Sequence, residues 1–120
     1  MTPVLMNNCR RRNHVWHFGP GAFFDLLREG KQREMANEIH DGNECIVATQ
    51  DGHRKNVEFA WFKVSHRKSM VDKKGVRCFV FFGEQSKSET MPKAKAAKAT
   101  LYSAFFDKRG HFKQISIVPS

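Results

Sequence analysis

Imidazole groups are the side chains of this sequence that most directly suggest chemistry. Six histidines occur in 120 residues, and histidine is the side chain best suited to proton transfer near neutral pH. A ribonuclease that works without a metal needs one imidazole to take the 2′-hydroxyl proton, another acid for the leaving oxygen and a cation on the phosphate. His53, His66 and His111 lie in basic stretches that supply such cations. A small metal-independent ribonuclease or toxin is therefore one hypothesis, but no spacing singles out a catalytic residue and we predict none.

Metal and thiol chemistry have weaker support. His14 and His17 are three residues apart in a predicted strand, where that spacing points their side chains to opposite faces. The three cysteines are widely separated and form no CxxC pair, so neither a zinc knuckle nor a redox motif is predicted. The sequence predicts no metal and no other cofactor, and it favours reduced thiols in a cytoplasmic protein.

Positive charge is concentrated in the second half of the chain. The formal net charge is +9, and it divides into six Lys/Arg against seven Asp/Glu over residues 1–53 and 15 against five over residues 54–120. Clustered cations are typical of proteins that bind a polyanion, and nucleic acid leads because phosphate contacts depend on Lys and Arg. No predicted helix pairs a basic face with a broad apolar face, so a membrane partner is not expected.

We therefore expect a non-catalytic nucleic-acid-binding module with a basic surface and an aromatic contact. The stretch FAWFKVSHRK, residues 59–68, carries both kinds of side chain, although the pattern favours a place in the core for Trp61 over a contact with nucleic acid. A protein partner stays open as an alternative, for example if the chain is a phage or mobile-element inhibitor that acts through its basic face. The candidate contact residues are Trp16, Arg54, Lys55, Trp61, His66, Arg67, Lys68, Lys73, Lys74 and Lys95.

Apolar periodicity predicts the elements that must position these residues. Residues 1–13 read as an arm and residues 14–120 as a single α+β domain, with helices over 22–40, interrupted at Gly30, and over 91–106. The predicted strands are 14–18, 44–49, 56–65, 76–83 and 111–118, separated by turns or loops at 41–43, 50–55, 66–75, 84–90 and 107–110.

The strand predicted over 56–65 has two apolar faces. Val57, Phe59 and Trp61 alternate with Ala60, Phe62 and Val64, as expected of a central strand that is buried on both sides. Such strands with few helices favour a small, strongly curled or closed, mostly antiparallel β-barrel with two or three helices.

A family resemblance rests on two short motifs. IHDGNECIVAT (39–49) and the early Trp16-His17-Phe18 resemble segments of PUA-like domains of the EVE and ASCH type, although Asn43 stands where those families usually carry Asp. The resemblance covers residues 14–82 and has no counterpart for the lysine-rich helix. It implies a mixed barrel that binds RNA, or a modified base of DNA in an aromatic pocket, and Trp16 is the residue that carries over.

Overall fold

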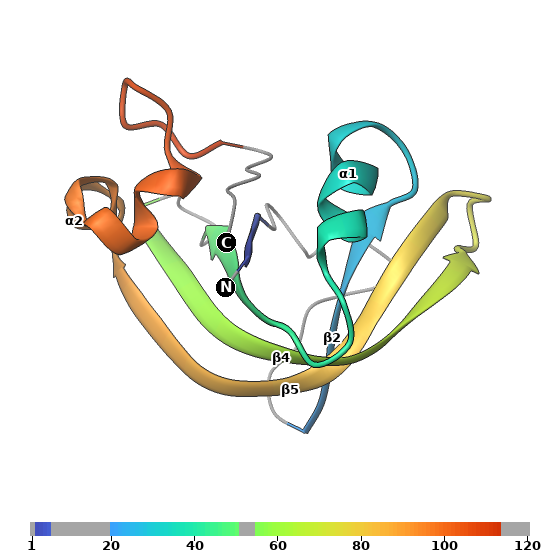
Figure 1. Cartoon of the computed structure of the whole chain (residues 1–120). Helices are drawn as coiled ribbons and strands as arrows, with labels where there is room; N and C mark the ends of the chain where they lie inside the picture. The colour runs from blue at the N-terminus through green and yellow to red at the C-terminus, as the bar shows by residue number, and fades with distance from the viewer. Residues whose placement is uncertain (1, 6–19, 51–54, 114–120) are drawn as a thin grey trace.

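Two long antiparallel strands form the centre of the fold. The computed structural model describes residues 2–5, 20–50 and 55–113, and β4 (Asn56–Val71) and β5 (Arg77–Pro92) contain 16 residues each. They form a strongly curved ribbon (Figure 1). The other elements are β1 (Thr2–Leu5), β2 (Pro20–Leu27), α1 (Gly30–Glu38), β3 (Glu44–Gln50), α2 (Lys93–Lys98) and the 3₁₀ helix η2 (Thr100–Phe105).

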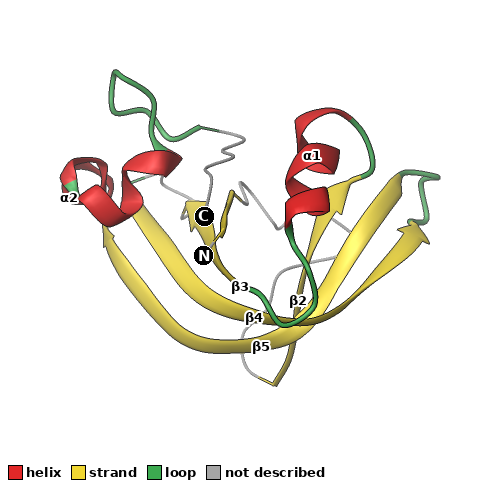
Figure 2. Ribbon diagram, viewed as in Figure 1, coloured by secondary structure: helices red, strands yellow, loops and turns green. Residues whose placement is uncertain are grey.

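The described strands make one open sheet in the order β1-β3-β4-β5-β2. β1 runs parallel to β3, and all other neighbours are antiparallel. The helices α1 and α2 stand at opposite ends of the curved ribbon (Figure 2). The α+β class, the mostly antiparallel sheet and the three short helices are confirmed. Closure into a barrel is wrong, because β1 and β2 lie at opposite edges of the described sheet and do not pair with each other.

Adjacent residues of the central strands alternate between two hydrophobic cores. The α1 core comprises Ala22, Phe24, Leu26, Met35, Ala36, Ile39, Cys45, Val47, Ala60, Phe62, Val64, Phe79 and Phe81. The α2 core comprises Ile46, Ala48, Val57, Phe59, Met91, Ala96, Tyr102, Phe105 and Phe106. The prediction of two apolar faces for β4 is therefore confirmed. Each large side chain removed from water in these cores contributes roughly 1.5–3 kcal/mol.

The predicted helix over 22–40 is wrong in its first half. Residues 20–27 form β2, because Ala22, Phe24 and Leu26 face the α1 core with the period of two that a strand requires. The Phe and Leu doublets also satisfy helical spacing, and pairing with β5 decides the outcome. Gly30 has a φ of 60°, which suits glycine, and it opens α1 instead of separating two helices.

Polar segments account for most other differences. The predicted loop 66–75 and linker 84–90 lie largely in β4 and β5, whose ends are exposed and need no apolar alternation. The helix predicted over 91–106 is divided at Ala99 into α2 and η2. Residues 2–5, assigned to an arm from sequence, form β1 on β3. The predicted strand 14–18 and residues 51–54 of the predicted turn lie outside the described residues, as does most of 111–118, in which Phe112 forms an isolated bridge with Phe106.

A β-bulge at Ser65 changes which side chains of β4 face the α1 core. Val64 pairs with Gly83 and His66 with Phe82, so two steps along β4 oppose one step along β5. After Val64, Arg67 is therefore the next side chain of β4 on the face of the α1 core, and His66 lies on the opposite face. Gly83 permits this approach of the strands, because a Cβ at that position would collide with the Lys63 carbonyl oxygen and lie 2.9 Å from Phe62 Cε1.

Candidate nucleic-acid interface

The described cations predicted to contact nucleic acid divide into two groups. Lys55 lies beside α2, where its carbonyl oxygen accepts a hydrogen bond from the Lys93 N–H (2.9 Å), and Lys95 is exposed on α2. Arg67, Lys68, Lys73 and Lys74 gather instead at the β4–β5 turn, at the other end of the curved ribbon (Figure 1). The curvature of the sheet therefore does not bring the two groups to the same end of the ribbon. Trp16 and Arg54 lie outside the described residues.

Three arginines, which we call the arginine cluster, lie on one sheet face near Phe79: Arg28, Arg67 and Arg77. Arg67 Cζ lies 4.5 Å from the centroid of the Phe79 ring and Arg28 Cζ lies 5.5 Å from it. Arg67 also donates a hydrogen bond from Nη1 to the Ala36 carbonyl oxygen (3.2 Å). A guanidinium group has five N–H donors, so this bond leaves most of the Arg67 donors available. The ring contacts therefore position guanidinium groups that can still bind an anion.

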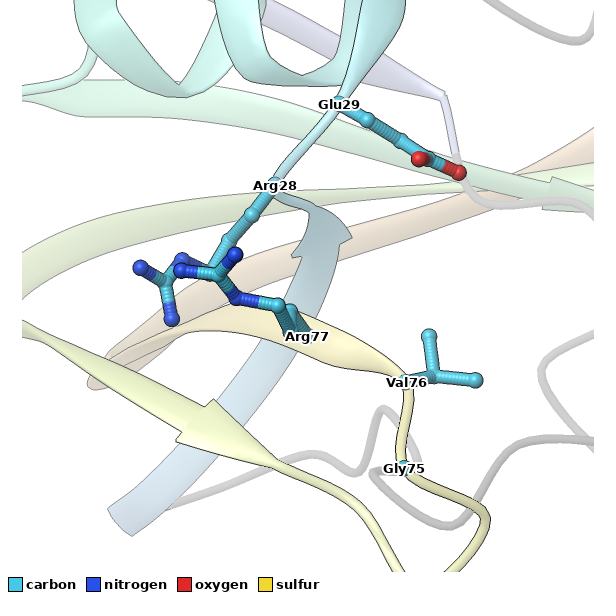
Figure 3. A pocket seen from close by; sticks show the side chains of 5 residues that line it. All are labelled: Arg28, Glu29, Gly75, Val76 and Arg77. Atoms are coloured by element: carbon cyan, nitrogen blue, oxygen red, sulfur yellow. The ribbon is translucent and has the colours of Figure 1, made fainter.

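Arg28 and Arg77 line an open depression of about 290 Å³ together with Glu29, Gly75 and Val76. The Arg28 N–H donates to the Arg77 carbonyl oxygen (3.1 Å), which holds the two backbones side by side. Figure 3 shows both guanidinium groups on the same side, whereas the Glu29 and Val76 side chains point away from them. Within residues 20–50 and 55–113, none of the three clustered arginines forms an ion pair with a carboxylate. The cluster is therefore a concentrated positive site.

The turn that follows β4 adds two lysines. Asp72 Oδ1 accepts hydrogen bonds from the N–H groups of Lys74 and Val76 (both 2.8 Å), which fixes a tight turn at its carboxylate. Lys73 and Lys74 are exposed on this turn. Lys68 is also exposed, on the opposite sheet face from Arg67. Six cations thus surround this end of the ribbon: Arg28, Arg67, Lys68, Lys73, Lys74 and Arg77.

The opposite face of the ribbon carries an aromatic row across three strands: Phe23 of β2, Phe82 of β5 and His66 of β4. The three residues are directly opposite one another in the strand registers. The His66 ring stacks on Phe82 with centroids 5.0 Å apart and planes inclined by 18°, and Phe82 lies 6.1 Å from Phe23. Both phenylalanines are half-buried, and His66 is exposed. The row therefore ends in an accessible flat ring.

Trp61 belongs mainly to the α2 core. The ring centroids of Trp61 and Tyr102 are 6.2 Å apart, and Lys87 Nζ lies 4.5 Å from the centroid of the Trp61 ring. The side chain is half-buried, whereas Phe79 is 9% exposed. The structure thus places Trp61 away from the arginine cluster, in packing contacts of its own.

The histidines proposed for a ribonuclease do not share a described site. His66 stacks on Phe82, whereas His111 Nδ1 lies 3.9 Å from Asp107 Oδ2 in the turn after η2. Hydrogen bonds from the backbone N–H groups of His111 and Arg109 lower the pKa of Asp107. His53 lies outside the described residues. The described part of the chain also contains no group of three His, Cys, Asp or Glu residues that could hold a metal ion.

Cys45 is a core residue and not a nucleophile. It is fully buried, and burial raises the pKa of its thiol to about 12. Its Sγ lies 3.7 Å from the Phe62 carbonyl oxygen.

Arg28 and Arg77 are the members of the arginine cluster that sequence reasoning missed. Arg28 fell in a predicted helix and Arg77 in a predicted core strand. The period-two pattern of Phe24, Leu26 and Arg28 is the signal that could have placed Arg28 on the face of the α1 core.

Three comparisons with known proteins found no match to the chain, whether among family models, curated proteins or solved structures. The PUA-like resemblance stays a prediction. None of the helices in the described ranges is long and apolar enough to cross a membrane.

Proposed function

We propose that this protein is a non-catalytic nucleic-acid-binding module that holds phosphates at the β4–β5 turn end of its sheet. The observation that carries the proposal is the arginine cluster around Phe79, with Lys68, Lys73 and Lys74 beside it. Planar guanidinium groups bind phosphate oxygens through paired N–H donors, and the aromatic contacts limit their freedom before the ligand arrives. Like charges gathered without described carboxylate partners favour an anionic ligand.

The strength of binding should depend steeply on salt. If about five of the six cations contact phosphates, log affinity should fall against log salt with a slope of about −3.5 for single strands and about −4.5 for duplex DNA. Phosphate contacts carry no base information, so charge reversal should weaken binding to all sequences alike. Binding without cleavage also separates this proposal from the ribonuclease alternative, in which recovered RNA would be cut.

Two matched double variants test where the nucleic acid lies. Lys73→Glu with Lys74→Glu reverses two exposed lysines at the β4–β5 turn, and Lys95→Glu with Lys98→Glu reverses two lysines on α2. Both variants change the net charge equally. Fluorescence anisotropy with labelled RNA and DNA should show weaker binding and a shallower salt slope for the first pair only, with thermal melts confirming that both variants fold. Equal losses of affinity from both double variants would mean that the net charge of the protein, and not the arginine cluster and its neighbouring lysines, attracts the ligand.

A further inference from the structure

The aromatic row indicates which form of nucleic acid this end of the ribbon accepts. We infer that the protein binds single-stranded nucleic acid, with a base stacked on His66 while the neighbouring phosphates contact Arg67 and Lys68. The inference rests on the proposed function and specifies its ligand class. It comes from three features: an edge of β4 that none of the described strands occupies, the bulge at Ser65, and an exposed ring at the end of a stack.

The first feature is the edge of β4 beyond Lys63, which none of the described strands occupies. β3 pairs with β4 only as far as Lys63, and Val64 completes this edge through backbone hydrogen bonds with Gly42 and Asn43. Within the described residues, no strand pairs with the same edge of β4 from His66 to Val71. Both sheet faces of this segment can therefore be reached from one side by a flexible ligand.

The second feature is the change of face at the bulge. Without the extra residue, strand alternation would keep His66 on the same face as Val64, in the α1 core. The bulge instead places Arg67 on that face, against Phe79, and sends His66 and Lys68 to the other face. This edge of β4 thus offers a flat ring with cations close by in the chain, as stacking sites for single strands require.

The third feature is the stacking and exposure of the His66 ring. One side of the imidazole is stacked on Phe82, which fixes its orientation, and the side chain remains exposed. A base could therefore extend the existing stack. Bases in a duplex are already stacked and paired, so they cannot occupy this position without being unstacked. A stacking contact consequently favours single strands, whereas the phosphate contacts alone would accept both forms.

A comparison of base-bearing and abasic oligonucleotides isolates the stacking contact. A short labelled oligothymidine and an abasic phosphate–deoxyribose chain of equal length carry the same charge, and only the first can stack. The wild-type protein should bind oligothymidine at least about five-fold more tightly than the abasic chain, the lower range for one stacked base. His66→Ala should remove this preference without weakening abasic binding, and His66→Phe should retain it. His40→Ala, which removes another exposed histidine, is the control and should behave as wild type.

The outcomes separate this inference from the function on which it rests. If wild type binds neither chain, both the proposed function and the inference are wrong. If wild type binds both chains equally, phosphate binding stands and base stacking is refuted. Stacking on His66 is also refuted if His66→Ala weakens both chains alike, or if a folded His66→Phe variant loses the preference.

Discussion

The close approach of β4 and β5 at the bulge leads to a stability prediction for Gly83→Ala. The new Cβ would meet the backbone oxygen of Lys63, which cannot rotate away, and would press on Phe62. The strands would have to separate locally, with loss of about two ladder hydrogen bonds at roughly 1 kcal/mol each and roughly 1–3 kcal/mol of packing strain. Alanine recovers roughly 0.5–1 kcal/mol because it restricts the unfolded chain. We expect the free energy of unfolding to fall by about 2–4 kcal/mol.

Thermal unfolding followed by circular dichroism measures this loss. At this chain length each kcal/mol corresponds to about 3–5 °C in Tm, so Gly83→Ala should lower Tm by about 6–20 °C. Gly75→Ala is the matched control, because Gly75 has a φ of 81° but an added Cβ there would have no neighbouring atom within 4 Å. The control carries only the backbone cost of roughly 1–2 kcal/mol. A decrease in Tm for Gly83→Ala no larger than that for Gly75→Ala would refute the proposed steric basis of the bulge.

Two further predictions concern titratable core groups. Burial, aided by the hydrogen bond to Glu89 Oε2 (2.7 Å), raises the pKa of Tyr102 from 10.0 to about 12, and the chain has a single tyrosine. Between about pH 10 and 12 the folded protein keeps the Tyr102 proton and the unfolded chain loses it, so the free energy of unfolding should decrease as the pH rises through this range. The phenolate absorbance of the folded protein should titrate well above pH 10. Glu89→Gln should lower the midpoint of this absorbance titration. A Cys9→Ser, Cys78→Ser variant leaves Cys45 as the single thiol. Because the pKa of this thiol is about 12, Cys45 should resist a thiol reagent at about pH 8 in the folded protein and react after denaturation. Rapid labelling of the folded variant would contradict the burial of Cys45.

The sequence is informative where strands are buried on both faces. In β3 and the first half of β4, every residue that enters a core is apolar, so the two-faced pattern predicts central strands. The turn at Asp41-Gly42 also follows from the sequence, and Gly42 has a φ of 85°. These segments are specified by local alternation and turn chemistry. Both signals can be interpreted without knowledge of the partner strand.

The remainder of the sheet depends on partners that the pattern does not reveal. The apolar residues of β2 fit both the helical period of 3.6 and the strand period of two, and pairing with β5 determines that the segment forms a strand. The polar half of β4 pairs with the apolar half of β5, and the polar half of β5 pairs with the apolar half of β4, although much of the surface of both polar halves is exposed. A polar strand of this kind is indistinguishable from a loop by hydropathy. The sequence does not show that the lysines of α2 and the lysines of the β4–β5 turn lie far apart. The length of the β4–β5 ribbon places them at its opposite ends.

The position of the candidate interface follows from one inserted residue. The segment Ser65-His66-Arg67-Lys68 has the composition of a basic loop, in which its cations would have no defined direction. In the sheet it is a bulge followed by a strand, so successive side chains project to alternate faces. Arg67 then reaches Phe79 and Ala36 at the margin of the α1 core, and His66 completes the row with Phe82. The bulge thus links the packing of the core to the placement of both contacts, which is why Gly83 should affect stability and binding together.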